Sequence, residues 1–222
     1  PTKTNSVGKL HRSDVYFRWV NEIAEGVAAV YPDKYLGLLA YREMYDPPQN
    51  EDGSPMKLHP NVIPYITDDR MTWEDAAIGA AGRQHTFNWA EAAEQIGFYE
   101  YQYGAQYNVP RIYFHRMADN YKFGVDNGVI GFTAELYVNW GEGPKAWLAS
   151  KLQWNPYQDV DALLDDWYVS AVGEAAAPYL KQYYELWENI WTNRIFQSAW
   201  YQNWANAAAR NKRFRACRKR RE

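Results

Sequence analysis

The sequence has little cysteine and no long apolar run. Cys217 is the single cysteine among 222 residues, so no disulfide bond can form within the chain. No apolar segment approaches the roughly 20 residues that a helix needs to span a bilayer. We therefore expect no membrane span.

The sequence also lacks the short motifs that mark the commonest cofactor sites. Its four histidines are scattered, with no His-x-x-x-His pair and no cysteine partner, which argues against a transition-metal site. It contains neither a glycine-rich phosphate loop nor a Gly-x-Ser-x-Gly turn, so the usual nucleotide-binding and serine-hydrolase motifs are excluded. We expect no metal and no cofactor.

Acidic residues are scarce at the C-terminal end and plentiful elsewhere. Residues 210–222 hold eight basic residues and one acid, Glu222. Subtracting these from the 24 basic and 27 acidic residues of the chain leaves residues 1–209 with 16 basic and 26 acidic groups, a charge of −10. Such an acidic body is a poor general partner for nucleic acid or anionic membranes, and we expect no nucleic-acid partner. We expect residues 207–222 to be a solvated, disordered tail.

Aromatic residues are abundant. They make up 17% of the chain, with 19 Tyr and 11 Trp, and hydrophobic residues make up 47%, which excludes a disordered chain. Tyr and Trp combine a flat apolar face with a polar edge, which suits wet clefts as well as a core. The composition leaves both interpretations open for any single ring.

Four short apolar segments have the length and composition of buried strands. They are YLGLLAY (35–41), NVIPYI (61–66), IGFYEYQYG (96–104) and VIGFTAE (129–135). Helical patterns lie before the first strand and between later ones, over about 13–31, 83–95 and 110–123. Strands that alternate with helices at this spacing indicate parallel β/α units and an α/β fold.

The number of units predicts an incomplete barrel. A (β/α)8 TIM-type barrel needs about 250 residues and twice as many strands. The chain begins on Pro1 rather than Met, in the middle of the pattern, so we expect the natural protein to extend upstream, and the lack of a visible signal peptide then excludes no compartment. We interpret the fold as the C-terminal half of such a barrel, with about four parallel strands. An open doubly wound sheet is the alternative.

After the last strand the pattern is helical. Pro144 suits the first position of a helix over KAWLASKLQW, Asp159 suits the cap of a second helix, and Pro178 opens a third. We therefore divide the chain into a partial β/α barrel over 1–155, C-terminal helices packed on the barrel over 156–206, and the basic tail over 207–222.

Active sites of parallel β/α folds lie at the carboxyl ends of the strands. Each of the four candidate strands ends near an acid with aromatic residues beside it. Flat rings accept the apolar face of a pyranose, while carboxylates and amides bind its hydroxyls. We therefore predict a carbohydrate-binding cleft lined by Tyr41, Arg42, Glu43, Asp68, Glu100, Tyr101, Tyr103, Tyr137, Asn139 and Trp140.

Glu135 is the candidate catalytic residue. It ends the fourth strand, where Gly131, Thr133 and Ala134 leave room beside it. Glycoside hydrolysis commonly uses carboxylates on either side of the scissile bond, and we expect this one to bind a sugar hydroxyl or stabilise an oxocarbenium ion. The alternative is that Glu135 pairs with a neighbouring Arg or Lys and only ends the strand.

Several longer segments carry a resemblance to a known family. In order they are DVYFRWVNEIAEGVAAVYPDKYLGLLAY, LHPNVIPYIT, GFYEYQYG, VPRIY, GVIGFTAELYVNWGEGPKAWLASKLQWNP, DVDALLDDWY and WENIWTNRIFQSAWY. Together they resemble the bacterial family catalogued as domain of unknown function 4838. The resemblance is specific in order and spacing, covers roughly residues 13–200, and leaves the basic tail outside.

The resemblance implies a β/α barrel of the glycoside hydrolase type. Some members of the family are placed in glycoside hydrolase family 163, endo-acting β-N-acetylglucosaminidases that release N-glycans. The resemblance implies that the substrate's acetamido group acts as nucleophile beside a pair of acids, and that this pair lies upstream of Pro1. The isolated chain is then expected to be inactive. The implied setting is a secreted or periplasmic bacterial protein that processes polysaccharides.

Three functions remain open from the sequence. The first is glycoside-hydrolase-like processing of N-acetylglucosamine-containing glycans by a full-length parent protein, in which this chain supplies half of the barrel. The second is a non-catalytic carbohydrate-binding domain with the same aromatic cleft. The third is a fragment with no independent function. The acidic body favours neutral or amino sugars over polyanions, with Arg42 as the candidate partner of a uronate carboxylate.

Overall fold

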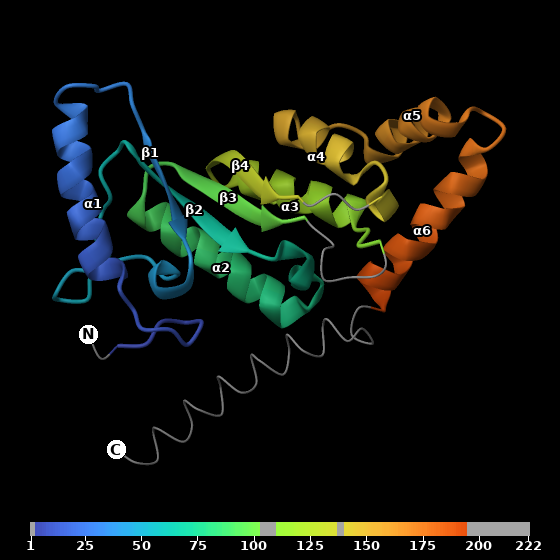
Figure 1. Ribbon diagram of the computed structural model, residues 1–222. Helices are drawn as coiled ribbons and strands as arrows, with labels where there is room; N and C mark the ends of the chain where they lie inside the picture. Colours follow the sequence, from blue (N-terminus) through green and yellow to red (C-terminus); the bar gives the residue numbers. More distant parts are fainter. Residues whose placement is uncertain (1–2, 103–109, 137–139, 195–222) are drawn as a thin grey trace, which may run out of the picture. The chain divides into compact units, whose positions relative to one another are not determined.

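The computed structural model describes residues 3–102, 110–136 and 140–194. Within them, four strands form one parallel sheet whose order follows the chain, β1-β2-β3-β4 (Figure 1). The strands are β1 (Leu36–Ala40), β2 (Val62–Asp68), β3 (Ile96–Tyr101) and β4 (Val129–Glu135). The predicted α/β class, the four parallel strands and their order are confirmed.

An α-helix precedes β1, and α-helices also lie between β2 and β3, between β3 and β4, and after β4. The α-helices of the described residues are α1 (Ser13–Ala28), α2 (Ala76–Ala92), α3 (Phe114–Asp126), α4 (Lys145–Trp154), α5 (Val160–Val172) and α6 (Ala177–Asn193). Short 3-10 helices are η1 (Arg42–Met44), η2 (Arg70–Glu74) and η3 (Trp140–Glu142). In the part of the chain that the structure describes, no helix is both long and apolar enough to cross a membrane.

Two helix starts differ from the predicted ones. The helix predicted over 83–95 begins earlier, at Ala76, because the Asp75 side chain accepts hydrogen bonds from the backbone N–H groups of Ala77 and Ile78 at 2.9 and 3.0 Å. The helix predicted from Pro110 begins later, at Phe114. Pattern periodicity locates a helix well but its first turn poorly, since the cap decides where it starts.

The predicted cap of α5 is confirmed. Asp159 accepts a hydrogen bond from the backbone N–H of Ala162 at 3.1 Å, which satisfies one of the free donors of the first turn.

The described residues form two compact units, of which the first holds residues 3–67 and 85–96. Its core packs α1 against the second half of α2: the rings of Phe17 and Trp89 lie 5.4 Å apart, and both are fully buried. In the sheet, Leu39 of β1 pairs with Tyr65 of β2 and remains 45% exposed, whereas Ala40, on the opposite face, is fully buried. Strand β1 therefore has one covered and one exposed side, whereas most residues of β2 are buried on both sides.

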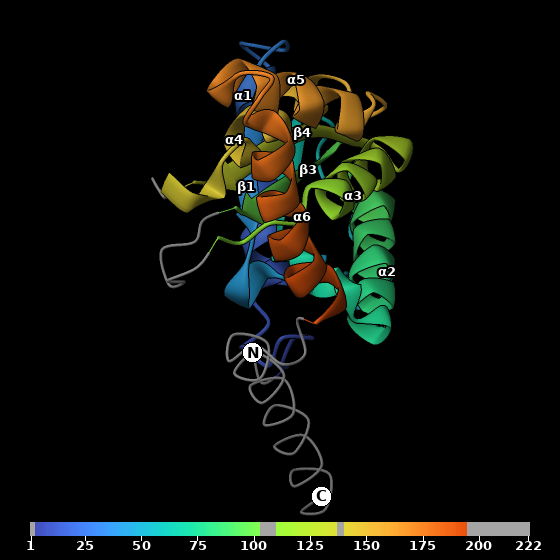
Figure 2. The same cartoon turned by 90° about the vertical axis from the view of Figure 1, so that its right-hand side faces the viewer.

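The second unit holds residues 68–84 and the described part of 97–194. Its core lies between α3 and one face of β3 and β4. Phe98 of β3 contacts Phe132 of β4 edge to face at 5.9 Å, and Tyr121 of α3 packs on Phe132 at 4.6 Å. Helix α3 also packs against α4. Helix α5 packs against α6 (Figure 2). The candidate site is built on this unit.

Candidate functional site

Side chains near the carboxyl ends of β3 and β4 are divided between two faces. Alternate residues of a strand point to opposite sides. Phe98 and Glu100 lie on the side covered by α3 and are buried. Tyr99, Tyr101 and Glu135 lie on the other side and are half-buried. We call this second side of β3 and β4 the open face.

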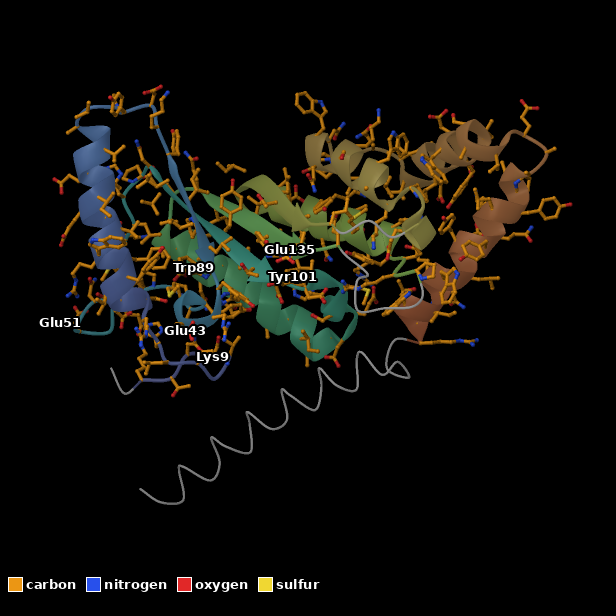
Figure 3. All side chains as sticks on the ribbon, in the orientation of Figure 1. Lys9, Glu43, Glu51, Trp89, Tyr101 and Glu135 are labelled. Carbon is orange, nitrogen blue, oxygen red and sulfur yellow. The ribbon has the colours of Figure 1, made fainter. Side chains whose placement is uncertain are left out.

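The open face brings one carboxylate and two phenol rings together. The hydroxyl of Tyr99 donates a hydrogen bond to Oε1 of Glu135 at 2.9 Å. The rings of Tyr99 and Tyr101 meet edge to face, with centroids 5.9 Å apart. Tyr101 and Glu135 end their strands, as Figure 3 labels them. The arrangement offers an anionic acceptor beside an apolar ring surface.

Glu135 therefore has a neutral partner. Among the described residues, the donor to its carboxylate is the phenol of Tyr99, and no Arg or Lys forms an ion pair with it. Tyr99 was not among the predicted site residues because it lies inside β3 rather than at its end. The signal that finds it is the two-residue spacing from Tyr101, which places both rings on one face of the strand.

Glu100, a predicted substrate-binding residue, is engaged on the covered side. It is 5% exposed, and its Oε1 lies 2.5 Å from Nη1 of Arg70, which is 1% exposed. Burial raises the pKa of Glu100 to about 7, even though the guanidinium of Arg70 opposes this by stabilising the charged form. The pair ties the end of β3 to η2.

Asp68, at the end of β2, also has protein partners. Its Oδ2 accepts a hydrogen bond from the Trp73 indole N–H at 2.9 Å, and its Oδ1 accepts one from the Asp69 backbone N–H at 2.8 Å. Burial raises the pKa of this carboxyl above its usual range. Asp68 therefore closes the turn that follows β2.

Asp69 pairs with an arginine that the sequence did not mark. Its Oδ1 accepts from Nη2 of Arg111, and Nη1 of the same guanidinium donates to the Tyr101 carbonyl at 2.7 Å. Arg111 is 1% exposed, whereas the Asp69 side chain keeps 19% of its surface. The guanidinium thus joins the ends of β2 and β3. Part of the Asp69 carboxylate remains exposed to solvent.

Three predicted residues belong to the first compact unit. Tyr41 follows β1 and is 41% exposed. Arg42 has φ of 52°, a left-handed conformation that is uncommon for residues other than glycine, and its carbonyl accepts from the Asn5 side-chain amide. The carbonyl of Glu43 accepts from the Arg12 backbone N–H at 2.9 Å. The N-terminal segment therefore holds the backbones of Arg42 and Glu43.

The remaining predicted residues lie outside the described part of the site. Tyr103, Tyr137 and Asn139 are outside the described residues, and so is the predicted tail over 207–222. The backbone of Trp140 begins η3. Among the described residues, no cluster of His, Cys, Asp or Glu is arranged to hold a metal ion.

A concavity of about 390 Å³ lies between α3 and α6, away from the open face. Several of its charged side chains pair with each other. Glu188 accepts from the backbone N–H of His115 at 2.8 Å and lies 2.9 Å from its ring Nδ1, while Arg116 pairs with Glu74. Its described lining contains no Tyr, Trp or Phe to stack on a sugar ring.

The model of one family, Domain of unknown function (DUF4838), matches residues 1–185. The chain belongs to this family. The match confirms the resemblance to DUF4838 for the quoted segments up to residue 185 and covers every residue of the open face, whereas the segment over 187–201 lies beyond it. No curated protein and no solved structure matches this DUF4838 chain significantly.

Proposed function

We propose that this DUF4838 chain binds carbohydrate on the open face of β3 and β4, as part of a glycoside-hydrolase-like protein that processes N-acetylglucosamine-containing glycans. The observation that supports this best is the hydrogen bond from Tyr99 to Glu135 beside the ring of Tyr101. A carboxylate held by one phenol keeps acceptor capacity for sugar hydroxyls. The adjacent ring offers an apolar surface to a pyranose.

Glu135 is the functional acid in this proposal. It binds a substrate hydroxyl or stabilises the positive charge that develops at the anomeric carbon during bond cleavage. Asp68 and Glu100 hold the ends of β2 and β3 through Trp73 and Arg70, and they are not assigned to the sugar.

We also propose that the sheet is the C-terminal half of a (β/α)8 barrel of the family 163 type, completed by upstream residues of a longer, secreted or periplasmic parent. Support comes from apolar side chains of the first unit. Val15, Trp19 and Ile23 form an i, i+4, i+8 line on α1 and are 68%, 56% and 38% exposed. A neighbouring β/α unit covers such a line in a complete barrel. Hydrogen exchange at β1 that is no slower in the longer parent would contradict this.

Titration calorimetry of the chain with N-acetylglucosamine oligosaccharides tests the binding. We expect saturable binding that weakens about 10- to 150-fold in Glu135→Gln, because one hydrogen bond to a charged group contributes roughly 1.5–3 kcal/mol. Glu174→Gln, an exposed acid between α5 and α6, is the matched control and leaves the affinity unchanged. Full affinity in Glu135→Gln, or no binding of any neutral or amino sugar, removes the proposal.

Binding without hydrolysis is the second candidate function. The ion pair of Glu100 with Arg70 favours binding without hydrolysis, because this strand-end acid is bound by a protein partner instead of facing a substrate. Product release from the same oligosaccharides separates the two candidates. If the longer parent cleaves the oligosaccharides and the isolated chain does not, the enzyme is supported. If both proteins bind them and neither cleaves them, the binding domain is supported.

A further inference from the structure

Lys145, the first residue of α4, is fully buried. Its ammonium donates to the Arg111 carbonyl at 2.9 Å and forms an ion pair with Glu142, and the ring centroid of Tyr113 lies 5.5 Å from Nζ. Burying an ammonium is unfavourable, and an apolar side chain of the same length fills such a space without that penalty. Packing alone therefore does not explain why a charged residue stands at position 145.

Lys145 and Glu142 hold the backbone of Arg111 from both sides. Lys145 binds its carbonyl, and Oε1 of Glu142 accepts from its N–H at 3.3 Å. The indole N–H of Trp191 on α6 donates to the carbonyl of the preceding residue, Pro110. Side chains from η3, α4 and α6 thus fix this short segment before α3.

The side chain of Arg111 extends from this segment to the ends of β2 and β3, where its guanidinium is bound. A guanidinium is planar, so once the backbone and one nitrogen are held, the direction of the other nitrogen is set. Nη1 is held by the Tyr101 carbonyl, and Nη2 then meets the carboxylate of Asp69. Asp69 is therefore oriented by a guanidinium whose backbone and Nη1 are both hydrogen-bonded.

We propose that Lys145 is a positioning residue, which acts through Glu142 and Arg111 to present Asp69 as a second carboxylate for a sugar hydroxyl. The ligand in this inference rests on the proposed function, whereas the positioning of Asp69 does not. Asp68, the neighbour of Asp69, serves the turn by accepting from Trp73. The two adjacent acids therefore have separate tasks.

Titration of Lys145 sets an upper pH limit for this arrangement. Burial lowers the pKa of Lys145 to about 8, against the attraction of Glu142. Among the described residues, the other groups that face it are Arg111, Asp69 and the ring of Tyr113, whose hydroxyl pKa is raised well above its usual value by burial. Above pH 8 the ammonium loses its proton, Glu142 loses its counter-charge, and the hold on Arg111 weakens.

The test measures the affinity of the full chain for the N-acetylglucosamine trisaccharide at pH 7 and pH 9. We expect Lys145→Met and Asp69→Asn each to weaken binding about 10-fold at pH 7. The double variant is also about 10-fold weaker, because both changes remove the same oriented carboxylate. Between pH 7 and pH 9 the affinity falls in the wild type and stays level in Lys145→Met.

Lys151→Met is the matched control, since Lys151 is an exposed lysine on the same helix, and it retains wild-type affinity. Where Lys145→Met does not fold by circular dichroism, Glu142→Gln replaces it and gives the same pattern. Wild-type affinity in Lys145→Met overturns the positioning role. A double variant about 100-fold weaker also overturns it, because additive losses mean that Lys145 supports the fold rather than Asp69.

If the wild type binds no trisaccharide, the proposed function is contradicted, but the positioning role of Lys145 can still be tested. The nitrogen-15 NMR signal of the Arg111 guanidinium is then the readout at pH 7. A signal that is sharp in the wild type and in Lys151→Met but lost in Lys145→Met supports the positioning. A signal that Lys145→Met retains overturns it.

Discussion

Nη1 of Arg70 lies 2.5 Å from Oε1 of Glu100, and both side chains are buried. The guanidinium carbon also lies 3.4 Å from the ring centroid of Phe98, and the Asn120 amide donates to the Arg70 carbonyl at 3.2 Å. This one arginine therefore connects η2, β3 and α3. It keeps the ends of β2 and β3 in place beneath the open face.

Removing one member of this pair is expected to be more harmful than removing both. Arg70→Met leaves a buried carboxylate without its cation, and we expect the free energy of unfolding to fall by about 3–5 kcal/mol. The double variant Arg70→Met/Glu100→Leu recovers much of this loss, because no charge remains buried. Urea unfolding measures both values. A double variant no more stable than Arg70→Met would argue against a charge-based explanation.

Glu100 is expected to make stability depend on pH around neutrality. Its pKa rises from 4.5 to about 7 because burial disfavours the carboxylate. The folded state then holds the proton more tightly than the unfolded state, so this contribution is full below pH 4.5 and is lost as the pH rises through 7. We expect the wild type to lose about 1–3 kcal/mol more than Glu100→Gln between pH 5 and pH 7.5 in urea unfolding. Parallel pH profiles would contradict this.

His115 is expected to stabilise the contact of α3 with α6 when it is charged. Its hydrogen bond to Glu188 raises its pKa from 6.5 to about 9. A raised histidine pKa contributes stability fully below pH 6.5 and loses it as the pH rises through 9.

Because half of the His115 side chain is exposed, solvent screening limits its contribution to about 0.5–1 kcal/mol. His115→Gln and Glu188→Gln should both remove this fall in thermal unfolding between pH 7 and pH 9.5. If only one of them does, the two side chains do not act as a pair.

Gly143, between η3 and α4, is expected to tolerate no larger residue. Its φ is +54°, and a Cβ placed there would lie 2.2 Å from the hydroxyl of Tyr184. Gly128 has φ of +85° with open space around it, so Gly128→Ala measures the backbone strain alone, about 1–2 kcal/mol. We expect Gly143→Ala to cost about 2 kcal/mol more than this control in urea unfolding, through the clash. Equal losses in the two variants would mean that Tyr184 moves aside.

Tyr99 is expected to orient Glu135 for a sugar. Tyr99→Phe keeps the ring but removes the donor to the carboxylate, so affinity for N-acetylglucosamine oligosaccharides should fall about 3- to 10-fold with little change in stability. Tyr179→Phe, at an exposed tyrosine of α6, is the control. Unchanged affinity in Tyr99→Phe, measured by calorimetry, would show that Glu135 needs no orienting partner.

The sequence by itself determined the strands, their parallel order and the helices that follow them. These features depend on short-range patterns: apolar runs of strand length, helical periodicity and caps such as Asp159. The family could also be predicted from the segments quoted above, and the match over residues 1–185 confirms it. Element ends were less predictable, as α2 shows, because the cap at Asp75 precedes the pattern.

Only the tertiary structure decided which side of β3 is covered. Strand alternation places Glu100 and Tyr101 on opposite sides, and packing puts Glu100 against Arg70 on the side of α3 and leaves Tyr101 on the open face. Both sides of a central strand are apolar enough to be buried, so the sequence pattern does not say which side a helix covers.

The partners of Asp69 were likewise decided by packing. Arg111 lies 42 residues away in sequence, and Lys145 lies 34 residues beyond Arg111. A single arginine or lysine in a helical region usually indicates a solvated surface, and nothing local distinguishes these two. Their charges meet Asp69 and Glu142 because α3 and α4 pack together in the second unit, which removes the side chains from water and leaves each charge only a protein partner.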